Sequence, residues 1–292
     1  MEDAPRCRRE GGCSVASIDR FPEMVEGQTG VPDCQVFAEG FSGPARAAIL
    51  GASAIAGAAG GLALAGAPDI RGAVWGVLGV SAIAGGVLST WSPCGYSSIS
   101  LLRPTGRGAK AVADWLPTFA MHGAGYALGA LILGTALGGI GAILGFAGFG
   151  TAALVMLALV GLIYGAHQLD FLRVPYPQRR AQVPHDARVR FSKPVVGGLY
   201  GLALGLDYMT YVQTPLLYLI TLAAVLTGNI PEAVAMMALF NLGRYLPVAA
   251  SALPVNDYQI QAWLARNQER AAMADGAILV ALGAAFAVAA LA

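Results

Sequence analysis

Two short stretches of this sequence place a thiol or a charged side chain inside long apolar runs. The first stretch is Trp91-Ser92-Pro93-Cys94-Gly95, in which Cys94 directly follows a proline. Proline inside a helix removes a backbone hydrogen bond and interrupts the helix, and backbone groups exposed at an interruption can make a nearby thiol reactive. Cys94 is therefore a candidate redox or otherwise reactive thiol. The alternative is a small buried side chain that fills a crowded bundle.

The second stretch, residues 207–215, begins with Asp207 and ends with Pro215. A carboxylate near the middle of a membrane costs at least about 2.5–3.5 kcal/mol, so it is expected to have a partner or a role in protonation. Arg244, inside the following apolar run, is the expected counter-charge. The two residues are predicted to form either a buried ion pair that orients two helices or a proton or substrate site.

The rest of the chain is unusually apolar. Of 292 residues, 56% are hydrophobic and 12% are charged, and the formal net charge is +1. Soluble domains carry about a quarter charged residues, so this composition excludes a soluble globular enzyme, a disordered protein and a nucleic-acid binder. We therefore expect an integral membrane protein embedded in the lipid bilayer.

The apolar runs predict seven membrane spans. A spanning helix needs roughly 20 mainly apolar residues, and the polar tail of residues 1–44 contains no such run, nor is a cleaved signal peptide expected. The expected spans are about 47–66, 72–101, 118–138, 142–166, 195–226, 232–253 and 273–291. The third and fourth lie within one uncharged run, and Gly138–Gly141 is predicted to form the turn between them.

The positions of Lys and Arg predict the orientation of the chain, because cytoplasmic loops are enriched in these residues. With seven spans, one side of the membrane holds sixteen of them and the other side holds only Arg71. The sixteen are Arg6, Arg8, Arg9, Arg20, Arg46, Arg103, Arg107, Lys110, Arg173, Arg179, Arg180, Arg188, Arg190, Lys193, Arg266 and Arg270. The N-terminus is expected in the cytoplasm of a bacterium and the C-terminus in the periplasm.

The two chemistry-bearing stretches occupy matching positions in the predicted fold. Each interrupts an unusually long span with a proline, Pro93 or Pro215, and each span opens a set of three. The sets cover about residues 70–166 and 195–292, and the second is inverted relative to the first. Paired broken helices in inverted repeats mark functional sites at the membrane midplane. The expected fold is an all-α polytopic bundle with one extra helix and an inverted 3+3 repeat.

This arrangement resembles the CcdA/DsbD family, which carries reducing equivalents across the bacterial inner membrane. That family places Pro-Cys-x-x-Pro in the first helix of each repeat, and here Ser97 replaces the second proline of the first motif. In the second motif Pro215 is present, but Val212 stands where the partner cysteine belongs. The resemblance implies a transmembrane thiol carrier that takes electrons from thioredoxin, whereas the missing cysteine argues against it.

The extra helix and the cysteine-containing tail most resemble the CcdA-related membrane proteins of methylamine-utilisation gene clusters. That resemblance implies a non-enzymatic role in the biogenesis of periplasmic methylamine dehydrogenase. The implied partners are the small, quinone-bearing subunit of the dehydrogenase and other maturation proteins. A third hypothesis is a transporter that uses the cavity of the inverted repeat for small molecules or protein export.

The other cysteines and the histidines indicate a function less clearly. Cys34 in the tail is a weak candidate for a disulfide with Cys94, while Cys7 and Cys13 lack further ligands at zinc-binding spacing. No metal or cofactor is therefore expected. His122 and His167 are expected at opposite ends of the third and fourth spans, where anchoring at the membrane interface is favoured over a proton relay.

Overall fold

The computed structural model describes most of the chain beyond the N-terminal tail. The described residues are 40–92, 95, 98–99, 102–104, 106, 108–175, 190–210, 212, 214–253 and 257–292, without the side chains of 257, 258 and 261. Within these ranges the chain forms helices and no strands. The all-α prediction is confirmed, whereas nearly all of the predicted polar tail lies outside the described residues.

Six of the helices, some with their 3-10 extensions, are long and apolar enough to cross a membrane. In chain order the elements are α1 (Gly43–Ala65), α2 (Ile70–Leu88) with η1 (Ser89–Trp91), α4 (Ala109–Ile143), α5 (Thr151–Gln168), α7 (Lys193–Gly205), α8 (Leu216–Leu226), α9 (Ile230–Tyr245) with η2 (Leu246–Ala252), and α10 (Asp257–Leu291). The expected fifth span is divided into α7 and α8, each too short to cross alone. The chain is a polytopic helical bundle.

Polar side chains start three of these helices by capping otherwise unpaired backbone N–H groups. Ser42 accepts a hydrogen bond from Ala45 N at the start of α1, and Asp69 accepts one from Gly72 N at the start of α2. Asn229 does the same for α9. These caps explain where the helices α1, α2 and α9 begin.

The turn between α4 and α5 lies at residues 144–150, so its prediction at Gly138–Gly141 was wrong. Gly138 and Gly141 are inside α4 and bring it against neighbouring backbone. A Cβ on Gly138 would lie 2.7 Å from Ile230 Cα, and one on Gly141 would lie 1.9 Å from Val225 O. The reversal instead uses Gly145 and Gly148, whose φ angles of +76° and +105° favour glycine.

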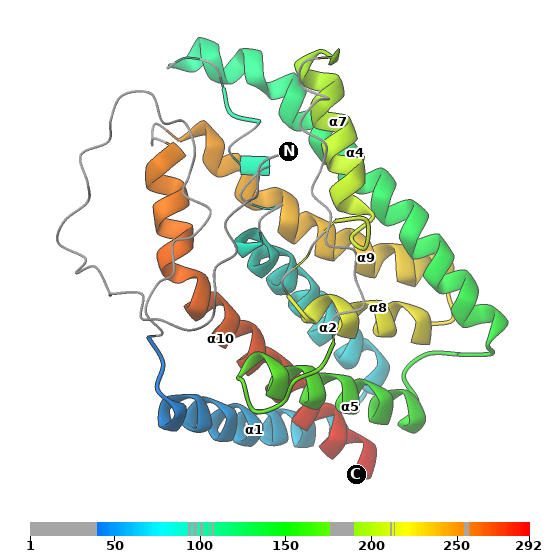
Figure 1. The fold of residues 1–292 in the computed structure, drawn as a ribbon. Coiled ribbons are helices and arrows are strands. Elements are labelled where there is room, and N and C mark those ends of the chain that lie inside the picture. Colours follow the sequence, from blue (N-terminus) through cyan, green and yellow to red (C-terminus); the bar gives the residue numbers. More distant parts are fainter. Residues whose placement is uncertain are drawn as a thin grey trace, which may run out of the picture. The chain divides into compact units, whose positions relative to one another are not determined.

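The helices pack in a small number of close pairs (Figure 1). The long α4 lies against α7 and α9, and α2 also packs on α9. The other long helix, α10, lies between α1 and α5. The short α8 contacts α2, α4, α5 and α9, and its Leu216, Leu217, Leu219 and Ile220 are completely or almost completely buried. The core of the bundle therefore surrounds the second half of the broken span.

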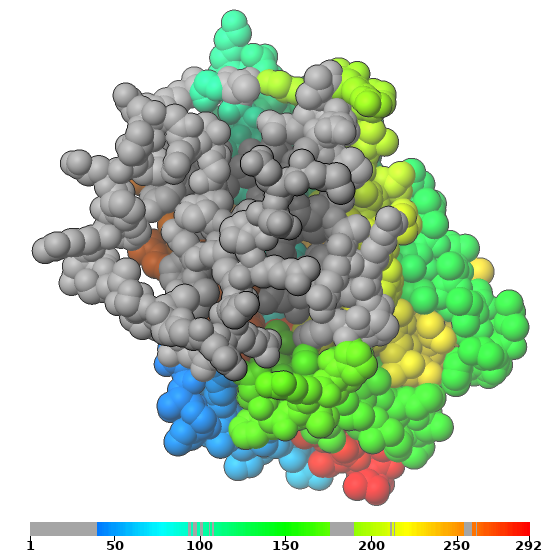
Figure 2. Space-filling model, viewed as in Figure 1, coloured from blue at the N-terminus to red at the C-terminus, as the bar shows by residue number. Residues whose placement is uncertain are grey.

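Large apolar side chains are exposed on the outer faces of the helices. They include Ile55, Val80 and Ile143, which are 74%, 70% and 87% exposed. Figure 2 shows α1, α5 and the C-terminal end of α10 together at the lower edge of the molecule. Apolar exposure of this extent is expected where a helix faces lipid hydrocarbon instead of water.

Two arginines, Arg46 and Arg71, form ion pairs that differ in burial. Arg46 in α1 donates to Asp170, after α5, and to Glu269 in α10 at 3.0 Å. The Arg46 side chain is only 10% exposed. Arg71 in α2 pairs with Glu232 in α9 at 2.8 Å, but its side chain is 52% exposed. The Arg46 cluster therefore ties together three parts of the chain in a drier environment.

Replacing Arg46 with glutamine is expected to destabilise the bundle by about 1.5–3 kcal/mol, because hydrogen bonds to charged groups are lost in a partly buried site. The matched change Arg71→Gln should cost less than about 1 kcal/mol, as is usual for an exposed pair. Thermal unfolding of the two purified variants in the same detergent measures the difference. Equal losses would show that burial does not set the strength of these pairs.

Candidate functional site

The break between α7 and α8 places a charged side chain and polar backbone groups inside the bundle. α7 ends at Gly205, and Asp207 follows with a φ of +51°, a left-handed conformation that aspartate tolerates better than most residues. Asp207 N–H donates to Leu204 O at 3.0 Å. Pro215 directly precedes α8, and the interruption of the span extends from the end of α7 at Gly205 to this proline.

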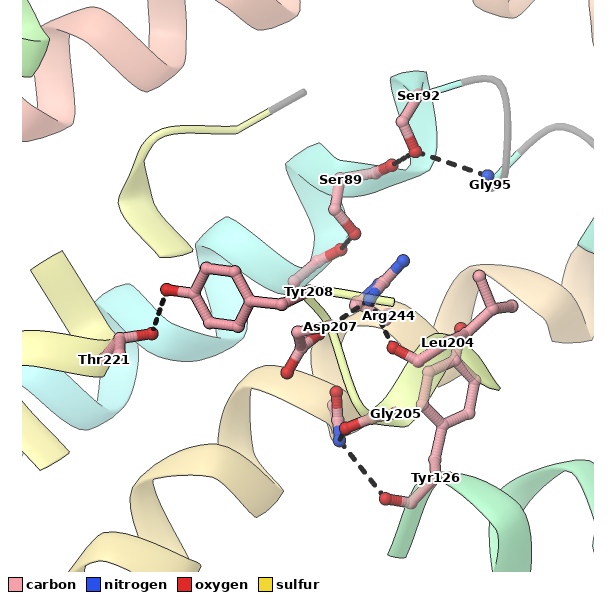
Figure 3. A network of polar contacts seen from close by, with 12 residues as sticks. Ser89, Ser92, Gly95, Tyr126, Leu204, Gly205, Asp207, Tyr208, Thr221 and Arg244 are labelled. Atoms are coloured by element: carbon pink, nitrogen blue, oxygen red, sulfur yellow. Dashed lines mark hydrogen bonds and ion pairs between the residues drawn. The ribbon is translucent and has the colours of Figure 1, made fainter. Parts of the chain in front are cut away.

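Asp207 and Arg244 form a buried ion pair at this break (Figure 3). One guanidinium nitrogen, Nη1 of Arg244, donates to Asp207 Oδ1 and to Leu204 O, both at 2.6 Å. The side chains of Asp207 and Arg244 are 0% and 2% exposed. The expected counter-charge is therefore in place, and it fastens α9 to the end of α7.

Two further side chains complete the environment of the pair. Asn241, one helical turn before Arg244, donates from Nδ2 to Gly205 O at 2.9 Å and to Tyr126 O at 3.2 Å. The Arg244 guanidinium carbon lies 5.9 Å from the centre of the Tyr126 ring, within range of a cation–π interaction. Sequence reasoning missed Tyr126, although its position four residues after His122 places both on one face of α4.

His122 lies within α4 and is fully buried, and its predicted anchoring at the membrane interface stays a prediction. α4 begins at Ala109, before the start of the uncharged run. Its Nδ1 lies 3.0 Å from Gly197 O, which assigns the proton to Nδ1 because a carbonyl oxygen only accepts. His167 lies at the end of α5, where its Nδ1 is 3.0 Å from both Leu172 O and Val174 N.

Several buried polar atoms of this site have no hydrogen-bond partner in the part of the chain that the structure describes. They are Asp207 Oδ2, Asn241 Oδ1 and His122 Nε2. Buried polar atoms are normally paired, so an unpaired one indicates strain, function or an additional bound group. Each of these atoms can accept a hydrogen bond, Asp207 Oδ2 as a carboxylate oxygen, Asn241 Oδ1 as an amide oxygen and His122 Nε2 because the proton is on Nδ1. The site can therefore receive hydrogen bonds from a donor such as water or a protonated ligand.

Two serines precede the predicted motif at the first helix break. Ser89 donates to Gly86 O and Ser92 donates to Ser89 O, both at 2.6 Å, and Ser92 also accepts from Gly95 N at 3.3 Å (Figure 3). These bonds satisfy backbone groups that the end of α2 leaves unpaired. Pro93 and Cys94 lie outside the described residues, as does Cys34, so their predicted roles stay predictions.

Val212 stands where the CcdA/DsbD resemblance implies a second cysteine. It is 1% exposed and belongs to the apolar core together with Leu216 and Leu217. The second break therefore offers no thiol at this position. Within the described ranges, no group of three or more His, Cys, Asp or Glu residues could hold a metal ion.

Fold and site together define a class of protein: a polytopic α-helical membrane protein with a charged pair buried beside a broken helix. Three relatives are similar over most of the chain. Methylamine utilization protein MauF of Paracoccus denitrificans is 69% identical over 277 residues, covering 95% of this chain and 100% of the relative. The MauF of Paracoccus versutus is 70% identical over 280 residues, with the same two coverages.

The MauF of Methylorubrum extorquens is 56% identical over 257 residues, covering 87% of this chain and 90% of the relative. No family model and no solved structure matches the chain. Identities of this size over nearly complete chains establish the relationship, and the chain belongs to the MauF family of methylamine utilization proteins.

Proposed function

We propose that this protein acts in methylamine utilisation as an inner-membrane factor for the biogenesis of periplasmic methylamine dehydrogenase. The observation that carries the proposal is similarity over nearly the full chain to proteins named for methylamine utilisation. The factor supports maturation, processing or export of the small, quinone-bearing subunit and works with other maturation proteins. It is not itself the enzyme that oxidises the amine.

The proposed orientation places the N-terminus in the cytoplasm and the C-terminus in the periplasm. The broken pair α7–α8 counts as one crossing, which gives seven crossings with the six long helices. The distribution of Lys and Arg then supports this direction. In this orientation the start of α9 and the C-terminal end of α10 lie at the periplasmic face, where the dehydrogenase subunits assemble.

We also propose that the bundle is an inverted repeat of the CcdA/DsbD type. Under that proposal α2, α4 and α5 correspond to α7–α8, α9 and α10. The packing is consistent with this correspondence, because α4 contacts α7 as α9 contacts α2, while α4 pairs with α9 and α5 pairs with α10. An inverted repeat places the site between the two sets, at the midplane.

A second candidate function is transport through the centre of the repeat. The observation that favours it is the broken helix with Asp207 Oδ2 and Asn241 Oδ1 left unpaired in the interior. Transmembrane electron transfer from thioredoxin through Cys94 is less well supported, because Val212 occupies the position of the second thiol and is packed in apolar core. A disulfide there would need Cys34 or another partner.

Gene deletion in a methylamine-using bacterium tests the proposal. The deletion strain is expected to lose the small subunit of methylamine dehydrogenase from its periplasm, and the full-length chain should restore it. Cys94→Ser should restore it equally if the protein is a scaffold and should fail if it carries electrons. Normal dehydrogenase activity in a deletion strain that cannot grow on methylamine would contradict the proposal and favour transport.

A further inference from the structure

α10 carries a second buried carboxylate, Asp275, in addition to the Asp207 pair. Asp275 is 1% exposed and lies near the middle of the apolar stretch Ala262–Leu291, which is long enough to span a membrane. The methylamine-utilisation proposal does not use this residue. A carboxylate at such depth is costly and is expected to have a function or a partner.

Asp275 contacts the end of the second helix break, whereas Asp207 lies at its start. Its Oδ1 accepts a hydrogen bond from the Thr214 hydroxyl, two residues before α8 begins. α8 has no side-chain cap of its own at this end. The Asp275 carboxyl group therefore lies beside the N-terminus of α8, where the helix dipole favours negative charge.

The other oxygen, Asp275 Oδ2, has no hydrogen-bond partner among the described residues, and Asp275 belongs to the lining of a small cavity. The cavity has about 10 Å³ for the centre of a water-sized molecule, close to the minimum for one water. It is lined by Leu88, Trp91, Gln168, Thr214, Gln268, Ala271, Ala272 and Asp275. The cavity thus lies between the end of α2, just before the first break, and the second break.

The described surroundings of Asp275 provide no positive counter-charge. The cavity lining contains no other charged side chain. The cations on the helices packed against α10 have other partners, since Arg46 in α1 binds Asp170 and Glu269, and Arg71 in α2 binds Glu232.

Titratable groups elsewhere near α10 are also engaged away from Asp275. The Nδ1 of His167 in α5 contacts Leu172 O and Val174 N, and Asp207 in the break is paired with Arg244. On α10 itself, Arg266 donates to Ala262 O and Arg270 donates to Asn267. Of the two buried carboxyl groups in the described residues, Asp207 is paired with an arginine and Asp275 is not.

We propose that Asp275 is a proton-binding site inside the membrane, and that the proton it exchanges is coupled to the second helix break. With a proton on Oδ2 the group is neutral and can donate into the cavity, to one water or to an amide oxygen. Without the proton it places a full negative charge beside Thr214 and the start of α8. The two states therefore hold the break differently, and the proposal does not depend on the role in dehydrogenase biogenesis.

Labelling with a hydrophobic carbodiimide tests this site in the full-length protein in liposomes. The reagent adds to a protonated carboxylic acid, whose proton moves to a reagent nitrogen, and mass spectrometry locates the adduct. Asp275 is expected to carry the adduct at acidic pH and to lose it as the pH rises. Asp275→Asn is the matched control, because it removes the carboxyl group and keeps the shape of the side chain.

A second measurement avoids dependence on reagent access. Infrared difference spectra between acidic and alkaline pH should contain the carbonyl band of a protonated carboxylic acid. The band should disappear in Asp275→Asn and change in frequency in Thr214→Val, which removes the hydrogen bond but keeps the shape. A band absent from the wild type, or unchanged in Asp275→Asn, would overturn the proposal. Suppression of the adduct by sodium chloride, but not by choline chloride, would overturn it in favour of a metal-ion site.

Discussion

Replacing Arg244 with methionine is expected to destabilise the protein by about 3–5 kcal/mol, the usual cost of leaving one charge of a buried pair uncompensated. Asp207 would stay 0% exposed and lose the donor that lies 2.6 Å from its Oδ1. Leu204 O would lose the same donor. The measurement is the unfolding free energy of the purified protein in mixed micelles, compared with the wild type.

The double variant Asp207→Asn with Arg244→Met is expected to be more stable than the single Arg244→Met variant. Asparagine keeps the shape of the side chain and tolerates the φ of +51° at this position. It also removes the charge that would otherwise be buried alone. A double variant that loses the full sum of the two single losses would show that the residues act separately and that the pair does not carry the stability.

The same double variant separates structure from function at the pair. A folded double variant that still restores the small subunit of methylamine dehydrogenase would assign Asp207 and Arg244 to holding α7 against α9. A folded variant that restores nothing would assign them to the chemistry of the site. Arg71→Met is the matched control, because it removes an arginine whose pair with Glu232 is half exposed.

The broad fold and the ion pair could be predicted because their energies are large and local in origin. Burying charge in lipid is so costly that uncharged runs of about 20 residues can hardly be anything except spans. The same cost made Arg244 the expected partner of Asp207 before any geometry was known. A break in this span was expected from Pro215 because proline lacks an N–H, but α7 already ends at Gly205, so the proline accounts only for the start of α8.

Other features depended on where helices end, which hydropathy alone does not determine. α4 begins at Ala109, so it includes Lys110 and Asp114 and places His122 deep inside the bundle. α10 likewise begins at Asp257. The seventh span was predicted to start near residue 273. That start placed Asp275 at a membrane interface, where its charge gave no reason to expect a buried site.

Glycine was ambiguous for a different physical reason. The residue serves equally as a turn former and as a place where two backbones meet, and Gly138 and Gly141 have the second use. Only a three-dimensional arrangement shows which neighbours approach them. The same small-residue contacts hold α7 in place, and they lead to the second large prediction.

Replacing Gly201 in α7 with leucine is expected to cost more than about 3 kcal/mol and to remove most of the folded protein, because overpacking here meets backbone that cannot rotate aside. A Cβ on Gly201 would lie 2.1 Å from His122 O. α7 could accommodate it only by moving away from α4, and Leu204 and Asp207 follow directly at its end. The variant should therefore lose both stability and the Asp207–Arg244 contact.

The matched control is Gly76→Leu in α2, where a Cβ would meet nothing within 4 Å and the new side chain would extend outward from the bundle. Leucine also favours helix over glycine, so this variant should be neutral or slightly more stable. Fluorescence-detected size-exclusion chromatography after a heating series compares the two in crude detergent extracts. Equal melting temperatures would mean that α4 and α7 are not held by close backbone contact, and the position of Asp207 would then need another cause.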